Sequence, residues 1–436
     1  MFNVRVVDVQ TTAVVNASTV TGSRDKIFDT IFQLAEAVVQ SFDKKVTIVD
    51  NRPAVRTAPP AERIVLSPDQ RRMLRERGTT SRGAYEAIGR ALVARDADEQ
   101  IRWYTKAIEC DPGYSNAYND RGNAYQRKGD LQRAMQDYGR AVQADAKNPL
   151  PYYNRANVFA EQDQYDRALS ELNRAVALKP DFALAYGNRA LVLAKQGLWD
   201  QSIADCDRAI QLNPLQANAY NNRGIAYKNK SDLRRAMDDY AQAIRINPYA
   251  ADPYTNRGNI LRETGHYAEA LREFSQAIAL NPQKAEPYYG RGTCHYAAKR
   301  YDLALQDYGR AIQLAPDDYR AYFGRANTCN AMRRFDQAIA DATKAIELKP
   351  DAALAYYMRG FAYGCKNDVR NAILNHSKAI ELNPNYGDAY KARAIACLVA
   401  RDYDRAWADV RACRRLGAPL PAQFIDMLSR ASGRRE

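Results

Sequence analysis

The sequence predicts an all-α fold, a solenoid of about ten helix-turn-helix units that follows a small, incomplete α+β segment. Nine arginines stand 34 residues apart without interruption, and a tyrosine lies three residues before each one. A fixed period of this length indicates a stacked array of one supersecondary unit. The arginines are Arg121, Arg155, Arg189, Arg223, Arg257, Arg291, Arg325, Arg359 and Arg393.

The unit is read most easily when Ser115 is counted as position 1. Positions 8, 20 and 27 hold small residues, which let two antiparallel helices approach closely. Larger apolar residues at positions 17, 28 and 30 are expected to fill the remaining space, and their spacing is helical. Examples are Tyr267, Ile278 and Leu280.

Turn residues predict where both helices of the unit end. Position 32 is proline in seven units, from Pro180 to Pro384, and proline cannot continue a helix. Glycine falls at position 15 in three units, which indicates that the first helix ends there. These glycines are Gly129, Gly197 and Gly265. Each unit is therefore expected to be helix, turn, helix, turn.

This pattern resembles the tetratricopeptide repeat family. The residues that carry the resemblance are Ala219-Tyr220, Arg223-Gly224, Tyr227, Ala236, Tyr240, Ala243-Ile244 and Asn247-Pro248. The resemblance implies a right-handed superhelix that serves as a scaffold for protein–protein interaction. Position 7 departs from the family, which usually has an apolar residue where this chain has arginine.

The arginine at position 7 is expected to be structural. Eight of the nine units carry Asp or Glu at position 23, so an ion pair between the two helices is a better interpretation than a site for phosphate or acidic peptides. The exception is Asn375. The acids are Asp137, Glu171, Asp205, Asp239, Glu273, Asp307, Asp341 and Asp409.

The ends of the chain divide into further segments. The repeat array is expected over residues 81–420 and a capping helix over 421–433, with a linker over 51–80. Residues 1–50 read as a β-hairpin followed by an amphipathic helix over 25–42. The stretch 4–40 resembles the last hairpin and helix of a bacterial lipoprotein domain, found in the curli secretion channel and in penicillin-binding-protein activators. That resemblance implies a truncated domain.

Composition bears on chemistry and location. The net charge is +13, but the array carries only a mild basic excess, so no nucleic-acid stripe is expected. Seven cysteines without a CxxC motif and three histidines suggest packed side chains, and we expect no cofactor, no metal and no catalytic residue. No apolar run reaches membrane-spanning length and Met1 starts no evident signal peptide. The expected location is the cytoplasm by default, or the periplasm or membrane surface if the N-terminus is truncated.

By resemblance to the family, positions 2, 5, 6, 9, 12 and 13 of the first helices line a concave groove. An amide side chain can pair with both groups of a peptide bond, and a similar asparagine ladder is known in O-linked GlcNAc transferase. Aromatic residues beside glycines favour shallow pockets for an apolar anchor. Asparagines that merely tolerate a wet surface, and aromatics that pack between units, are the alternatives. The candidates are Asn154, Asn188, Asn222 and Asn256 at position 6, Asn123, Asn157 and Asn259 at position 9, and Tyr289, Phe323 and Tyr357 at position 5.

The chaperone-type carboxylate clamp of the family is not expected. It needs lysine at position 5 with asparagine at position 9, and the only lysine at position 5, Lys391, is followed by Ile395. The favoured function is a non-enzymatic scaffold that binds an extended peptide of a protein partner. The alternatives are a substrate-presenting or assembly subunit of an envelope-associated complex, in export or cell-wall machinery, or a non-catalytic partner of a separate enzyme. The sequence does not indicate an oligomeric state.

Overall fold

The computed structural model describes residues 2–7, 14–20 and 79–434. The chain separates into two compact units, residues 1–198 and residues 199–436, and each is described by itself. The helix expected over 25–42 and nearly all of the expected linker lie outside the described residues.

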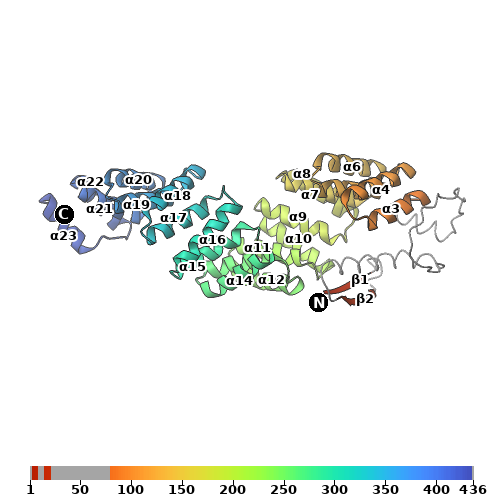
Figure 1. The fold of residues 1–436 in the computed structure, drawn as a ribbon, viewed down its shortest axis with the longest axis horizontal. Coiled ribbons are helices and arrows are strands. Elements are labelled where there is room, and N and C mark those ends of the chain that lie inside the picture. Colours follow the sequence, from red (N-terminus) through yellow and green to blue (C-terminus); the bar gives the residue numbers. More distant parts are fainter. Residues whose placement is uncertain (1, 8–13, 21–78, 435–436) are drawn as a thin grey trace, which may run out of the picture. The chain divides into compact units, whose positions relative to one another are not determined.

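The described residues of the first unit form a two-stranded antiparallel hairpin, in which Phe2 lies opposite Val20, and the helices α3 to α9 (Figure 1). Successive helices α3 to α9 pack against one another in chain order. The elements are β1 (Phe2–Val7), β2 (Val14–Val20), α3 (Arg82–Val93), α4 (Ala97–Cys110), α5 (Ser115–Arg127), α6 (Leu131–Ala144), α7 (Pro149–Glu161), α8 (Tyr165–Leu178) and α9 (Ala183–Lys195).

The second unit, as far as it is described, consists of helices, and consecutive helices again pack together. They are α10 (Trp199–Leu212), α11 (Ala217–Asn229), α12 (Leu233–Ile246), α13 (Ala251–Glu263), α14 (Tyr267–Leu280), α15 (Ala285–Ala297), α16 (Tyr301–Leu314), α17 (Tyr319–Ala331), α18 (Phe335–Leu348), α19 (Ala353–Cys365), α20 (Val369–Leu382), α21 (Gly387–Val399), α22 (Tyr403–Arg415) and α23 (Ala422–Ser432). The all-α solenoid expected from the 34-residue period is confirmed.

One left-handed residue ends the first helix of every full repeat. Position 15 has a positive φ in all nine, because the chain must reverse within three residues between antiparallel helices. Glycine takes this conformation at Gly129, Gly197 and Gly265, as the sequence predicted. Six repeats place a residue with a side chain there instead: Asp163, Ser231, Lys299, Arg333, Asn367 and Arg401.

The core of each repeat depends on a match between positions 8 and 24. A β-carbon on Gly224 would come within 2.6 Å of the Tyr240 ring, and one on Gly258 within 2.9 Å of the Phe274 ring. Where position 8 is alanine, position 24 is smaller, as in the pair of Ala156 and Leu172. The rings at position 24 are the largest fully buried side chains, whereas Tyr267 at position 17, expected in the core, is 39% exposed.

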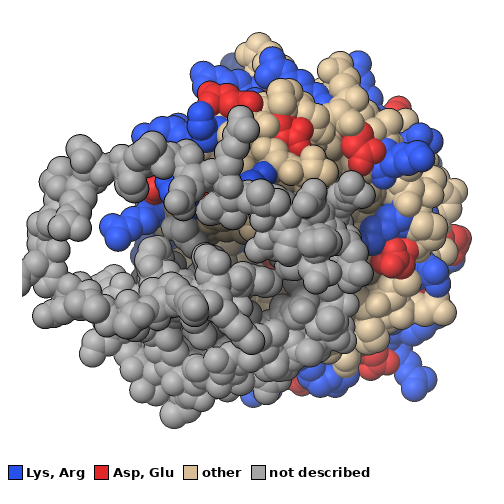
Figure 2. Space-filling view, turned by 90° about the vertical axis from the view of Figure 1, so that its right-hand side faces the viewer, with Lys and Arg blue, Asp and Glu red and all other residues tan. Residues whose placement is uncertain are grey.

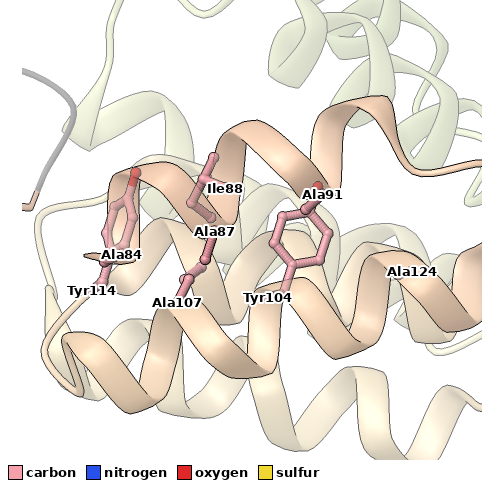
Figure 3. Packing of buried hydrophobic residues seen from close by; sticks show 9 residues of the cluster. Ala84, Ala87, Ile88, Ala91, Tyr104, Ala107, Tyr114 and Ala124 are labelled. Atoms are coloured by element: carbon pink, nitrogen blue, oxygen red, sulfur yellow. The ribbon is translucent and has the colours of Figure 1, made fainter. Parts of the chain in front are cut away.

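The first repeat uses alanines for the same close approach. Ala84, Ala87 and Ala91 of α3 are buried and face Tyr104 and Ala107 of α4 (Figure 3). Alanine contributes little transfer energy, but it lets larger neighbours such as Tyr104 make many van der Waals contacts.

The arginine at position 7 makes the expected ion pair with the acid at position 23 in most of the described repeats. Arg121 donates from Nε and Nη2 to both carboxylate oxygens of Asp137, at 2.7 and 2.8 Å, and the carboxylate raises the pKa of the guanidinium. The Asp137 side chain is only 3% exposed. In the repeat that lacks the acid, Arg359 donates to Asn375 at 2.7 Å. The other pairs are Arg155–Glu171, Arg223–Asp239, Arg257–Glu273, Arg291–Asp307, Arg325–Asp341 and Arg393–Asp409.

The third nitrogen of the same guanidinium reaches backwards to the preceding repeat. Arg121 Nη1 donates to Thr105 Oγ1 on α4, and Arg393 Nη1 donates to Ser377 Oγ on α20. Position 25 supplies this acceptor, sixteen residues before the arginine, just as position 23 lies sixteen residues after it. One side chain on a first helix therefore ties together the second helices of two consecutive repeats.

We predict that breaking one partner of the buried pair is costly and that removing both is not. Asp137→Leu leaves Arg121 buried without its carboxylate and should destabilise α5 and α6 by about 3–5 kcal/mol. The double variant Arg121→Met, Asp137→Leu should recover most of this loss. Hydrogen exchange of the α5 and α6 amides measures the local free energy of opening.

The control for this experiment is Lys106→Met, which breaks the exposed pair with Glu109 and should cost at most about 1 kcal/mol. A double variant as unstable as Asp137→Leu would contradict a structural role for the pair.

We also predict that Arg333→Gly stabilises the protein. Arg333 has a φ of 59°, a conformation that costs a residue with a β-carbon about 1–2 kcal/mol and glycine almost nothing. The greater freedom of glycine in the unfolded chain offsets part of the gain. The thermal midpoint should rise for Arg333→Gly and fall for the reciprocal control Gly265→Ala. Equal midpoints for wild type and both variants would contradict the argument.

Candidate peptide-binding surface

In the first unit, two of the predicted asparagines, Asn154 and Asn188, each donate a hydrogen bond to an asparagine of the preceding first helix. Asn154 on α7 donates from Nδ2 to Asn119 Oδ1 on α5, at 2.8 Å. Asn188 on α9 donates to Asn157 Oδ1 at 2.7 Å and to the Tyr153 hydroxyl at 3.0 Å. Both N–H groups of Asn188 are therefore used within the protein, while its oxygen remains able to accept a bond.

The remaining amides also have partners. Asn123 Oδ1 accepts from the Tyr138 hydroxyl at 2.8 Å. In the second unit, Asn256 donates to Asn221 and Asn259 donates to Glu286, at 3.0 and 2.9 Å. Asn222 is buried, with 8% of its surface exposed. The amide row thus helps to join neighbouring repeats, and only its spare donors and acceptors are left for a ligand.

The aromatic part of the prediction coincides with a hollow in the second unit. A cavity of about 520 Å³ is lined by Tyr289 of α15 and Phe323 of α17, two of the predicted residues. Tyr319, Tyr386 and the start of α19 complete its apolar wall. A cavity of this size is large enough for one bulky side chain and part of the backbone beside it.

Two cations and one amide also line this aromatic cavity. Arg320 is held by Asp318, which accepts from its Nε and Nη2, and its guanidinium lies 5.2 Å from the Tyr289 ring centre. Lys349 Nζ lies 4.9 Å from the Tyr319 ring centre. Asn383 is the amide. Sequence reasoning missed Lys349 and Asn383 because they lie in turns outside the groove positions taken from the family. Arg320 stands at groove position 2 but was not among the candidates.

The sequence placed Tyr357 in the same aromatic row, but the structure uses it differently. Its ring packs against Tyr386, with centres 5.0 Å apart, and against His376, at 5.6 Å. It therefore supports the wall of the cavity from behind. Where a β-carbon would stand on Gly290 and Gly324, the rings of Phe274 and Tyr308 fill the space.

An apolar strip continues from the aromatic cavity along α19 and α21. Leu354, a lining residue, is 42% exposed, and Phe361, seven residues further on, is 41% exposed. Ile395 and Val399 on the neighbouring α21 are 50% and 58% exposed. Residues four and seven apart share one helix face, so these side chains form a solvent-facing strip at the groove positions.

Most of the cysteines are packed inside the repeats, whereas Cys110 and Cys365 are exposed. Cys206, Cys294, Cys329, Cys397 and Cys413 are buried, as expected for small apolar residues, and burial raises the pKa of Cys206 to about 12. Among the described residues, no cluster of His, Cys, Asp and Glu side chains could hold a metal ion. No described helix has an apolar stretch of sufficient length to cross a bilayer.

Surface charge is mixed where it can be seen. On the face drawn in Figure 2, Lys and Arg side chains are interspersed with Asp and Glu side chains. Exposed ion pairs also join neighbouring repeats, for example Lys228 with Glu263 and Lys284 with Asp252.

The chain belongs to the tetratricopeptide repeat family. Models of the family match residues 103–136, 127–163, 156–197, 183–214, 217–249, 255–319 and 319–352, which together make up more than half of the sequence. Proteins of this family generally act as interaction scaffolds for other proteins. No curated protein sequence matches the chain significantly.

The chain is similar to several solved structures. A chain of the Cut9–Hcn1 hetero-tetramer of the APC/C is similar over 79% of this chain and 84% of its own, with 14% identity and a TM-score of 0.50. YrrB, described as a TPR protein with an unusual peptide-binding site, is 26% identical over 43% of this chain and 97% of its own, with a TM-score of 0.38. PilF of Pseudomonas aeruginosa is 17% identical over 46% and 92%, with a TM-score of 0.43.

We predict that the buried His376 makes stability depend on pH. Burial lowers its pKa from 6.5 to about 4. Between these values the unfolded chain binds a proton that the folded chain does not, so stability is full above pH 6.5 and falls as the pH drops towards 4. The contribution lost is at most about 3 kcal/mol.

The variant His376→Phe should remove this component of the pH dependence. Phenylalanine occupies the same position in Phe274, opposite a glycine as here. The drop in thermal midpoint between pH 7.5 and pH 4.5 should be smaller in His376→Phe than in the wild type, and unchanged in the control His266→Gln, which alters an exposed histidine. Identical drops in all three proteins would contradict the assignment.

Proposed function

We propose that this protein is a scaffold that binds an extended peptide segment of a partner protein on the first helices of its repeats. The observation that carries the proposal is the aromatic cavity between α15, α17, α19 and the turn before α21. It is apolar, open to solvent and continued by the apolar strip of α19 and α21. Exposed apolar surface of this kind commonly marks a docking site for another protein.

In this proposal the cavity takes one apolar anchor, and amides hold the backbone beside it. Asn256 and Asn259 keep unused hydrogen-bonding capacity after their internal bonds, because an amide offers two donors and two acceptor sites. Asn222 supplies a further amide in the same unit, and Asn123, Asn154, Asn157 and Asn188 hold the equivalent positions in the first unit. Each neutral bond contributes only about 0.5–1.5 kcal/mol, so the anchor should dominate affinity.

The test begins with random dodecapeptides displayed on phage and selected on the full-length protein. Selected peptides are then synthesised, and their affinities are measured by fluorescence polarisation. Phe323→Ala should weaken binding at least about tenfold, because a hot-spot anchor is worth roughly 2 kcal/mol. Tyr289→Ala should act in the same direction, and Asn256→Ala combined with Asn259→Ala should weaken binding a few-fold.

The matched control is Tyr249→Ala, which removes an aromatic ring that is 76% exposed and outside the cavity. Circular dichroism shows whether each variant remains helical. Peptides that bind Phe323→Ala and Tyr289→Ala as tightly as the wild type would show that the partner is held elsewhere.

A further inference from the structure

The charge of the aromatic cavity differs from that of the surface around it. Its lining contains Arg320 and Lys349 but no carboxylate. Acidic side chains do lie nearby, since Asp318 pairs with Arg320, and Glu286 is close enough to act electrostatically on the same guanidinium. Neither of these carboxylates reaches the wall of the cavity.

Of the two cations, Lys349 is the one that forms no ion pair among the described residues. It ends α18, is partly buried, and has no carboxylate within ion-pair distance among the described residues. Lys344, five residues earlier on α18, is by contrast exposed and paired with Glu347. A lysine that lies against the Tyr319 ring and has no acidic partner is positioned to accept one from outside.

Arg320 is held in place by Asp318, but not all of its hydrogen-bond donors have an acceptor among the described residues. Asp318 takes its Nε and Nη2 hydrogens and also caps the start of α17 by accepting from the Arg320 backbone N–H at 3.0 Å. No described residue accepts a hydrogen bond from its Nη1. The guanidinium is therefore held over Tyr289 with the N–H groups of Nη1 still to be used.

We propose that the peptide recognised by this cavity carries an Asp or Glu side chain next to its bulky apolar anchor. The anchor packs among Tyr289, Phe323 and Tyr386, and the carboxylate accepts hydrogen bonds from Lys349 Nζ and Arg320 Nη1. This inference rests on the proposed function and names the chemistry of its ligand. Charge-assisted bonds are about twice as strong as neutral ones, and the cations would repel a basic peptide.

A defined peptide pair tests the inference on the full-length protein. The probe is fluorescein-labelled Gly-Phe-Asp-Glu-Gly-amide, compared with Gly-Phe-Asn-Gln-Gly-amide, which has the same shape without the charges. We expect the acidic peptide to bind at least about fivefold more tightly, the difference that one charge-assisted bond provides. The preference should weaken as salt rises from 50 to 300 mM, roughly in line with screening of partly exposed charges.

Two variants separate the cavity from the general surface. Lys349→Met keeps the stem of the side chain against Tyr319 and should reduce the acidic preference to about twofold or less, since only Arg320 remains. Lys344→Met removes the same charge from the same helix and should leave the preference unchanged. Circular dichroism shows whether both variants stay folded.

Several other outcomes would overturn the inference. Equal binding of the two peptides would overturn it while leaving the apolar anchor, and so the proposed function, intact. Equal losses in Lys349→Met and Lys344→Met would assign the attraction to overall surface charge and overturn it. A third peptide, Gly-Asn-Gln-Gly-Phe with a free carboxyl end, that binds best would show that the chain terminus is recognised instead. Failure of the acidic peptide to bind below about millimolar concentration would overturn it too, and the selected dodecapeptides would then test the scaffold function independently.

Discussion

The architecture depends on an arginine guanidinium that donates hydrogen bonds both within its own repeat and to the preceding repeat. An arginine at position 7 has a partner sixteen residues ahead and, in many repeats, another sixteen residues behind, as in Arg223 with Asp239 and Asp207. A planar group with five donors can bind one carboxylate through two parallel bonds and still donate in another direction, a fixed geometry that neither an apolar residue nor a lysine provides. The pairs are largely buried, so they contribute more to the register between repeats than to net stability. The tyrosine at position 4 lies against the same guanidinium and limits its movement, for example 5.5 Å away in Tyr220.

Much of this fold follows from the sequence because the same local signals recur in every period. Small residues at fixed positions and proline at position 32 predicted the helices, and acids at position 23 predicted the ion pairs of position 7. The hydrogen-bond acceptor at position 25 was not predicted. In the repeats that precede an arginine this position varies among Thr, Ser, Asn, Asp, Gly and Ala, and the last two offer no side-chain acceptor. The partnership of positions 8 and 24 was also missed, although its signal is present: glycine at position 8 always accompanies Tyr, Phe or His at position 24.

The candidate surface was harder to predict, for a physical reason. The groove positions indicate which side chains face one side of a first helix, but the lining of a cavity also depends on residues in the turns. Tyr289 and Phe323 were found from their helix positions, whereas Lys349 and Asn383 come from the ends of second helices. Tyr357 occupies the right position on its helix but is not among the residues that line the cavity, and its ring packs against Tyr386, which is. The asparagines show the same limit, since their bonds across helices depend on distances that the period does not report.

The match between positions 8 and 24 has a consequence for how such an array can change. Repeat arrays grow and diverge by duplication and exchange of their repeats. Here each repeat requires its own match in size between position 8 and position 24. A first helix with alanine at position 8, such as α17, cannot be combined with a second helix that carries a ring at position 24, such as α12, because a methyl group would stand where Tyr240 packs. Exchange is therefore tolerated for whole helix pairs and not for single helices. The ring of position 24 also touches position 6 of the following repeat where that residue is Gly290 or Gly324. A repeat inserted at such a place would therefore need residues of matching size on both of its neighbouring sides.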